Sequence, residues 1–271
     1  SVAGSPGGRV VLAQHKGTVA GFVQLGAQTF EIHATPAGEA LLFEVVSPPL
    51  APGDAIQVPL DTAAGRAKLS TGTVGRLSAE LSPVFQDLLV VYTPAAMAER
   101  GPEALESMAL AAVAGANASY RESGVNLTVS LVGLQPIGIT EGSTSQETLG
   151  ALRTNADVAA RRNLVGADLV LLVTGATDSW CGMAYIMGNN DVQFAPFAFG
   201  VVRAPCLSGR TLTHELGHIQ GLAHDWETGG GAGAYPYARG YRRRPADGRA
   251  SSDSMARSCA VGPNHRLSAF A

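Results

Sequence analysis

The chain is poor in charged residues, in aromatic residues and in cysteine. Only 15% of its 271 residues are charged and 6% are aromatic, while 46% are hydrophobic. That balance excludes a disordered or fibrous protein and is typical of a globular one with a well-filled core. The formal charge of -3 leaves no concentrated basic face for nucleic acid, and the run Arg242–Arg244 is too short to supply one.

Long apolar stretches are also missing. No run approaches 18 uninterrupted apolar residues, so we expect no membrane span. The chain starts Ser1-Val2, with neither an initiator Met nor a signal peptide, and this leaves the compartment open because export signals are removed from mature proteins. Basic residues are almost all arginine, and alanine and glycine are abundant, a bias that points to a GC-rich, bacterial genome.

Three cysteines are present, at positions 181, 206 and 259. None has the Cys-x-x-Cys spacing of a structural zinc site. Outside the cytosol two of them would form a disulfide and leave one thiol over. The sequence alone allows three pairings.

Residues 1–82 have the sequence pattern of a small β-rich domain. Short runs of β-forming residues alternate with Gly or Pro, at Arg9–Gln14, Gly17–Leu25, Thr29–Ala34 and Glu39–Val46. The segment 47–53 holds three prolines and predicts a loop, and Ser82-Pro83 would be a linker. We therefore predict a small antiparallel sheet over residues 1–82.

Residues 86–271 change to an alternation of strands and helices. Strands are predicted at Asp87–Tyr92, Val125–Leu134 and Ala167–Thr174, and helices at Pro102–Glu122 and from a capping box at Thr144 and Glu147 to about Asn163. Pro102 suits a first helical turn and Gly124 a helix stop. The alternation predicts an α/β domain with a mostly parallel sheet.

The segment Thr211–Asp225 carries the chemistry. Its residues His214 and His218 are four apart, so on a helix they share one face and can converge on one ion. Zinc takes imidazole nitrogens at about 2.0–2.1 Å in a tetrahedral shell. Glu215 follows the first histidine, where it can take a proton from a bound water without being a ligand.

A third ligand depends on Gly221. His224 lies six residues after His218 and cannot reach the same ion on a straight helix, but a glycine can adopt a left-handed conformation and end the helix. Three histidines leave a fourth position to water, as in catalytic zinc sites. A bare His-Glu-x-x-His occurs by chance, and the added Gly221 and His224 make coincidence remote. His15, His33 and His265 are interpreted as ordinary surface or hydrogen-bonded histidines.

The string from His214 to Asp225 resembles the extended zinc signature of the metzincin clan. Asp225 directly after the third ligand is similar to the reprolysin (adamalysin) branch and its bacterial relatives. Met255 is the match for the methionine turn, which would support the three imidazoles from below. Two stretches are similar to the first strand and the cleft-lining strand of the bacterial relatives, Leu89–Ala96 and Cys181–Tyr185. The resemblance covers about residues 86 to 270.

The resemblance implies a secreted endopeptidase that cleaves proteins or peptides with one catalytic Zn²⁺ and Glu215 as general base. It implies a metzincin-like catalytic domain with a twisted, mostly parallel sheet and a zinc-binding helix. It also implies that residues 1–82 form a propeptide that contacts the catalytic domain. We expect a monomer, and calcium sites and cleavage preference stay open. The run Arg242–Arg244 could favour acidic residues near the cleft, but such a run is usually a solvated loop.

The chain departs from the family pattern in two places. Arg257 stands where astacins and serralysins have a tyrosine near the metal. A cysteine that usually follows is missing around Asn264, so Cys259 lacks its expected partner. Since Cys181 and Cys206 flank the cleft segment before the zinc helix, we predict that they pair and that Cys259 is free.

Two other functions remain open. One is a zinc-dependent binding module without catalysis, and the other is a zinc amidase or deaminase, although deaminases need a Cys-x-x-Cys that is absent. Latency is open too. Residues 1–85 contain no cysteine, which excludes a thiolate switch and leaves packing, or a weaker ligand such as a carboxylate or His33. The segment could also only assist folding.

Overall fold

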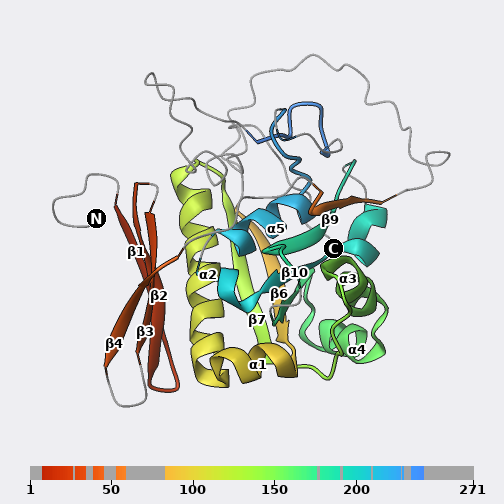
Figure 1. The fold of residues 1–271 in the computed structure, drawn as a ribbon. Helices are drawn as coiled ribbons and strands as arrows, with labels where there is room; N and C mark the ends of the chain where they lie inside the picture. Colours follow the sequence, from red (N-terminus) through yellow and green to blue (C-terminus); the bar gives the residue numbers. More distant parts are fainter. Residues whose placement is uncertain are drawn as a thin grey trace.

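The computed structural model describes residues 8–26, 28–34, 39–45, 53–58, 83–175, 178–189, 192–208, 210–226, 228 and 233–240. The predicted methionine turn, the third cysteine, the arginine run and His265 lie outside these residues, as does Ser82. The described elements form two sheets with helices between and around them (Figure 1).

The first sheet is antiparallel and has the strand order β1-β2-β3-β4. Its strands are β1 (Arg9–His15), β2 (Thr18–Leu25), β3 (Gln28–Ala34) and β4 (Ala40–Glu44), close to the four predicted runs. Lys16 and Gly17 join the first two strands with φ angles of 49° and 85°. A two-residue turn with both φ angles positive matches the twist of a hairpin. The predicted antiparallel β-rich region is confirmed.

The second sheet has six strands in the order β5-β9-β10-β8-β6-β7. They are β5 (Ala55–Gln57), β6 (Val84–Tyr92), β7 (Leu127–Pro136), β8 (Leu169–Thr174), β9 (Gly182–Ile186) and β10 (Phe199–Arg203). Every pairing is parallel except that of β9 with β10, which confirms the predicted mostly parallel sheet. The edge strand β5 comes from the N-terminal segment, so residues 1–82 contribute strands to both sheets.

Helices cover both faces of the six-stranded sheet. They are α1 (Pro94–Arg100), α2 (Pro102–Glu122), α3 (Ser145–Thr154), α4 (Ala156–Val165) and α5 (Thr211–Ile219), with short 3-10 turns η1 (Val192–Phe197) and η2 (Ala204–Cys206). Alternate residues of β6 point to opposite faces. Leu88 and Val90 join the core that holds α2 and α5, whereas Leu89 and Val91 join the core that holds α3 and α4.

The predicted single helix over residues 145–163 is wrong, because the structure breaks it at Asn155. This residue has φ −75° and ψ 120°, outside the helical region, and therefore ends α3. Its side chain then accepts a hydrogen bond from the Val158 N–H and caps the start of α4. The helix α1 was not predicted at all, although Thr93 caps it and Pro94 stands in its first turn.

The four-stranded sheet packs on α2, which lies between the two sheets (Figure 1). The ring of Phe22 is buried against Gly115, where an added Cβ would lie 2.7 Å from the tip of the ring. Ion pairs surround this contact, joining Arg9 to Glu122, Lys16 to Glu106 and Arg100 to Glu31. None of the helices in the described parts of the chain is long and apolar enough to cross a membrane.

Candidate metal centre

The helix α5 presents the first two histidines from a fully buried position. All nine of its residues are buried, including His214, Glu215 and His218. A chain of buried hydrogen bonds fixes the end of the helix, since the Tyr120 hydroxyl donates to Gln220, whose amide donates to the Gln86 side chain. This chain connects α2, α5 and β6. The two imidazoles are therefore held on a rigid element.

Gly221 turns the chain back as the sequence predicts. Its φ is 89°, and its N–H donates to the carbonyl of His218 at 2.9 Å. A Cβ at this position would meet the Ala234 Cβ at 2.5 Å, so both the backbone conformation and the space require glycine. The segment that follows is held by backbone hydrogen bonds between Ala223 and residues 238 and 240. His224 is thereby delivered to the face of α5 that carries the other two histidines.

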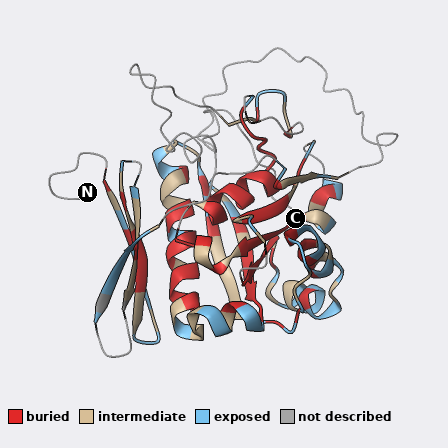
Figure 2. Ribbon diagram, viewed as in Figure 1, coloured by how far each residue is buried: buried red, intermediate tan, exposed pale blue. Residues whose placement is uncertain are grey.

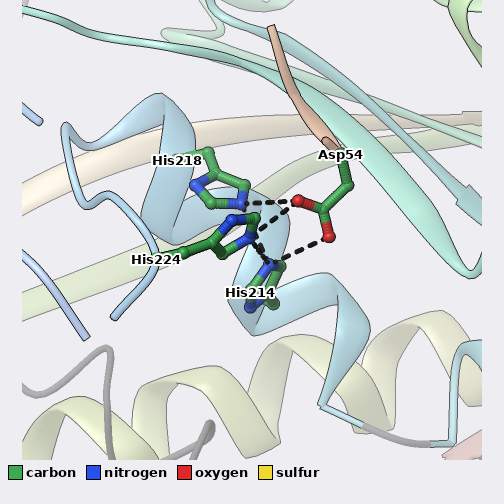
Figure 3. Close-up of side chains that lie close together, drawn as sticks. All are labelled: Asp54, His214, His218 and His224. Atoms are coloured by element: carbon green, nitrogen blue, oxygen red, sulfur yellow. Dashed lines mark hydrogen bonds and ion pairs between the residues drawn. The ribbon is translucent and has the colours of Figure 1, made fainter. Parts of the chain in front are cut away.

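Three Nε2 atoms and one carboxylate converge in the structure (Figure 3). The Nε2 of His214 lies 2.9 Å from that of His218 and 3.2 Å from that of His224. The fourth member is Asp54, whose oxygens lie 3.3 Å, 3.5 Å and 2.7 Å from the Nε2 atoms of His214, His218 and His224 in turn. The four ligand atoms lie within 4.8 Å of one another, and all four residues are buried.

These separations fit a tetrahedral metal ion. A shell with zinc–nitrogen bonds of about 2.0–2.1 Å places neighbouring ligand atoms about 3.3 Å apart. The Nδ1 of His218 lies 2.8 Å from the Leu222 carbonyl, which can only accept, so the Nε2 keeps its lone pair for an ion. Hydrogen bonds to carbonyls orient ligand histidines in this way in metal sites. The donor set is thus chemically suited to zinc.

The electrostatics favour the protonation states that metal binding needs. Burial, with a further effect of the nearby His214, lowers the pKa of His218 to about 4, so this imidazole is neutral near pH 7. Burial by itself would raise the pKa of Asp54, but the close approach of its carboxylate to the three histidine side chains holds that pKa far below its usual range. A neutral imidazole and an ionised carboxylate are the forms that bind metal.

Glu215 lies against β9 of the six-stranded sheet. Its side chain is buried, and a Cβ added to Gly182 of β9 would lie 2.4 Å from the Glu215 Oε1. Gly182 is therefore required by the close approach of this carboxylate. The predicted cleft strand, Cys181–Tyr185, overlaps β9, and the structure thus brings the predicted base and the predicted cleft strand together.

Asp54 is the member of the centre that sequence reasoning missed. It follows Gly53, whose φ is 119°, directly after a stretch predicted to be a loop. One carboxylate after a glycine carries no pattern that distinguishes it from other loop residues. His33, the ligand considered from the sequence, lies elsewhere and contacts Glu31 and Arg100.

A disulfide pairs Cys181 with Cys206, the pairing favoured from the sequence. It joins the start of β9 to η2, the short turn after β10. The neighbouring backbone is joined in the same direction, because the Arg203 N–H donates to the Cys181 carbonyl. The disulfide therefore anchors the strand that lines the candidate centre.

The model of metallo-peptidase family M12 matches residues 86–261, more than half of the chain. The chain belongs to this family, and the predicted reprolysin-like class is confirmed. It is 30% identical over 272 residues to the peptidyl-Asp metalloendopeptidase of Stenotrophomonas maltophilia (strain R551-3). The aligned region covers 95% of this chain and 61% of the relative. A peptidyl-Asp metalloendopeptidase of Pseudomonas aeruginosa is 30% identical over 60% of this chain and 31% of its own length. The chain spans less than two thirds of the length of these relatives.

One solved structure shares the fold at low sequence identity. The chain described as "Structure of a chaperone-substrate complex" matches with a TM-score of 0.50 and 17% identity. The match covers 86% of this chain and 35% of that chain. At this identity the likeness concerns the fold alone.

Proposed function

We propose that the protein is a zinc-dependent endopeptidase whose ion is held by His214, His218 and His224. The observation that carries the proposal is the convergence of three buried Nε2 atoms at separations that suit a tetrahedral ion. Membership of a metallopeptidase family and the names of the relatives support the same reaction. Zinc is the expected ion because it favours imidazole ligands in this geometry.

Glu215 is the proposed general base. When bound, zinc would acidify a water molecule and polarise the carbonyl of the bond to be cut. Glu215 follows the first ligand on α5 and lies against β9, so it would accept the proton of the attacking water. It would then donate a proton to the leaving amine. Proton transfer of this kind typically contributes about 10²–10⁴-fold to the rate.

The substrate would bind as an extended peptide along β9. This strand lines the centre, and its outer edge, which β5 occupies in the structure, would bind a peptide by backbone hydrogen bonds once it is free. The relatives are named for peptidyl-Asp cleavage, and we extend to this chain a preference for bonds at aspartate. Matched peptides with Asp, Asn or Glu at one position would test that preference.

The test of the function uses the full chain treated with trypsin, for which Arg66, Lys68 and Arg76 offer sites between β5 and β6. After trypsin is inhibited, we expect hydrolysis of casein that a zinc chelator stops. Glu215→Gln should lower the rate by at least about 10²-fold while the zinc content stays at one per chain. His224→Ala should lower the zinc content, whereas the control His15→Ala should not.

Two outcomes would contradict the proposal. Undiminished hydrolysis by the Glu215→Gln variant would exclude this base. Bound zinc without hydrolysis of any protein or peptide, before or after trypsin, would indicate a binding module in place of an enzyme.

A further inference from the structure

A residue outside the zinc motif completes the metal centre. Asp54 is 3% exposed, and its oxygens lie 2.7–3.5 Å from the Nε2 atoms of the three histidines. Figure 3 shows its carboxylate directed at the point where the imidazoles meet. A carboxylate buried among neutral rings is costly unless a cation compensates its charge. Its position is explained if it binds the same ion as the histidines.

The backbone around Asp54 is hydrogen-bonded to β9 of the six-stranded sheet. The Asp54 carbonyl accepts a hydrogen bond from the Ala184 N–H at 2.9 Å. The next three residues form β5, in parallel register with β9 from Ala55 opposite Ala184 to Gln57 opposite Ile186. β5 thus occupies the edge of β9, which an extended substrate would need in order to add as a strand.

Gly53 directs Asp54 into the centre. Its φ of 119° is one that other residues rarely adopt, and an added Cβ would lie 3.3 Å from the Trp180 ring. The turn at this residue and the pairing of β5 together determine where the carboxylate lies. Residues 53–58 are therefore placed by the backbone as well as by the side chain of Asp54.

We propose that residues 53–58 are a built-in inhibitor, in which Asp54 takes the fourth ligand position of the metal and β5 closes the sheet edge to substrate. The inference rests on the proposed function, because it assigns the ligand that would exclude the catalytic water. Removal of the segment from the centre, after cleavage between β5 and β6, would expose both the ion and the edge of β9.

Asp54 offers zinc a carboxylate, which is a weak ligand, and this explains why the chain on either side of it is also attached to the rest of the molecule. A carboxylate binds zinc less strongly than a thiolate, and residues 1–85 contain no cysteine. Tethering raises the effective concentration of a weak ligand to the millimolar range or above. The four-stranded sheet docked on α2 precedes Asp54 in the chain and the pairing of β5 with β9 follows it, so the ligand is tethered on both sides. A weak ligand of this kind is also easily displaced once the tether is cut.

The experiment compares full-length, zinc-loaded chains that have not been treated with trypsin. Asp54→Ala should hydrolyse a peptide faster than the wild type, by about tenfold or more if the inhibited form is at least nine-tenths populated. Glu44→Ala removes an exposed carboxylate of β4, which belongs to the four-stranded sheet, and should leave the rate unchanged. Asp54→Asn should be activated as well, because a neutral amide is a poorer ligand. Circular dichroism establishes that each variant is folded.

A second measurement does not depend on catalysis. In chains loaded with Co²⁺, replacement of a carboxylate ligand by water should change the visible absorption spectrum. Asp54→Ala should show that change, and acetohydroxamate should bind to it at least about tenfold more tightly than to the wild type. Glu44→Ala should match the wild type in both properties. The double variant Asp54→Ala/Glu215→Gln should keep the altered spectrum without hydrolysis.

The possible failures can be told apart. If Asp54→Ala and the wild type have equal rates and equal cobalt spectra, the inhibitor proposal is wrong, while trypsin-independent hydrolysis that depends on Glu215 would uphold the proposed function. If the wild type binds metal but neither Asp54→Ala nor the trypsin-treated chain hydrolyses peptide, the proposed function fails. In that case the cobalt spectra still decide whether Asp54 is a ligand.

Discussion

The two sheets of the molecule are stabilised in different ways. The central strands of the six-stranded sheet are buried on both faces by helices, and all six residues of β8 are buried. The four-stranded sheet packs one face on α2 and leaves much of the rest to solvent, as Figure 2 shows along β4. Its exposed apolar side chains include Leu12 and Phe43. The smaller sheet therefore depends on a single contact surface.

This difference separates two tasks within the N-terminal segment. The strands β1–β4 attach to the outside of α2 through the side chain of Phe22 and the ion pair of Lys16 with Glu106, and to α1 through an ion pair between β3 and Arg100. The short strand β5 attaches to the six-stranded sheet through backbone pairing with β9, and the carboxylate of the preceding Asp54 contacts the three histidines. The first contact determines how strongly the segment is held, and the second determines what it covers. A substitution at the contact with α2 should therefore leave the contact of β5 and Asp54 intact, and the reverse should also hold.

The largest effect is expected at the contact of the smaller sheet with α2. Phe22→Ala removes a ring that is 2% exposed and should lower the free energy of unfolding by about 3–5 kcal/mol. The control Phe43→Ala removes a ring that is 51% exposed in the same sheet and should cost less than about 1 kcal/mol. Urea unfolding measures both. Equal losses would show that the sheet does not depend on α2.

A smaller loss is expected at the turn of the metal centre. Gly221→Ala combines a left-handed backbone with a Cβ 2.5 Å from that of Ala234, and should cost about 2–4 kcal/mol and lower the zinc content. The control Gly166→Ala has a φ of 67° with nothing within 4 Å of the new Cβ, so it bears only the conformational cost of about 1 kcal/mol. Unfolding curves and metal analysis compare the two. A similar loss in both would mean that the crowding around Gly221 relaxes.

The smallest effect is the pH dependence of stability at the contact between the four-stranded sheet and α2. Burial by itself would raise the pKa of Glu106, but Lys16 and the Tyr92 hydroxyl hold that pKa below its usual value of 4.5. Because the folded pKa is lowered, the stabilisation is present above about pH 4.5 and is lost as the pH falls through the folded pKa. Since Lys16 is exposed, the contribution should be about 1 kcal/mol or less.

The free energy of unfolding, measured at pH 7 and below pH 4.5, tests this contribution. The wild type should lose more stability on acidification than Glu106→Gln, which lacks the charge at every pH. A larger loss in the variant would contradict the assigned direction of the pKa shift.

Much of the fold and most of the candidate centre could be predicted from local sequence. Strands such as Leu169–Thr174 are continuous apolar runs, and the spacing of His214, His218 and Gly221 sets the geometry of a helix and its end. These features depend on neighbours a few residues away. The break between α3 and α4 was missed because a single Asn155 can either continue a helix or cap the next one.

Sequence alone determined that His214 and His218 share a helix face and that a turn at Gly221 brings in His224, because each follows from spacings of a few residues. Only the tertiary structure decided that Asp54 joins those histidines and that β5 belongs to the six-stranded sheet. The pairing partner of a three-residue strand lies about 130 residues away along the chain, as the register of Ala55 with Ala184 shows. No local pattern encodes such a pairing, since it depends on which sheet edge is left open once the rest of the chain has folded.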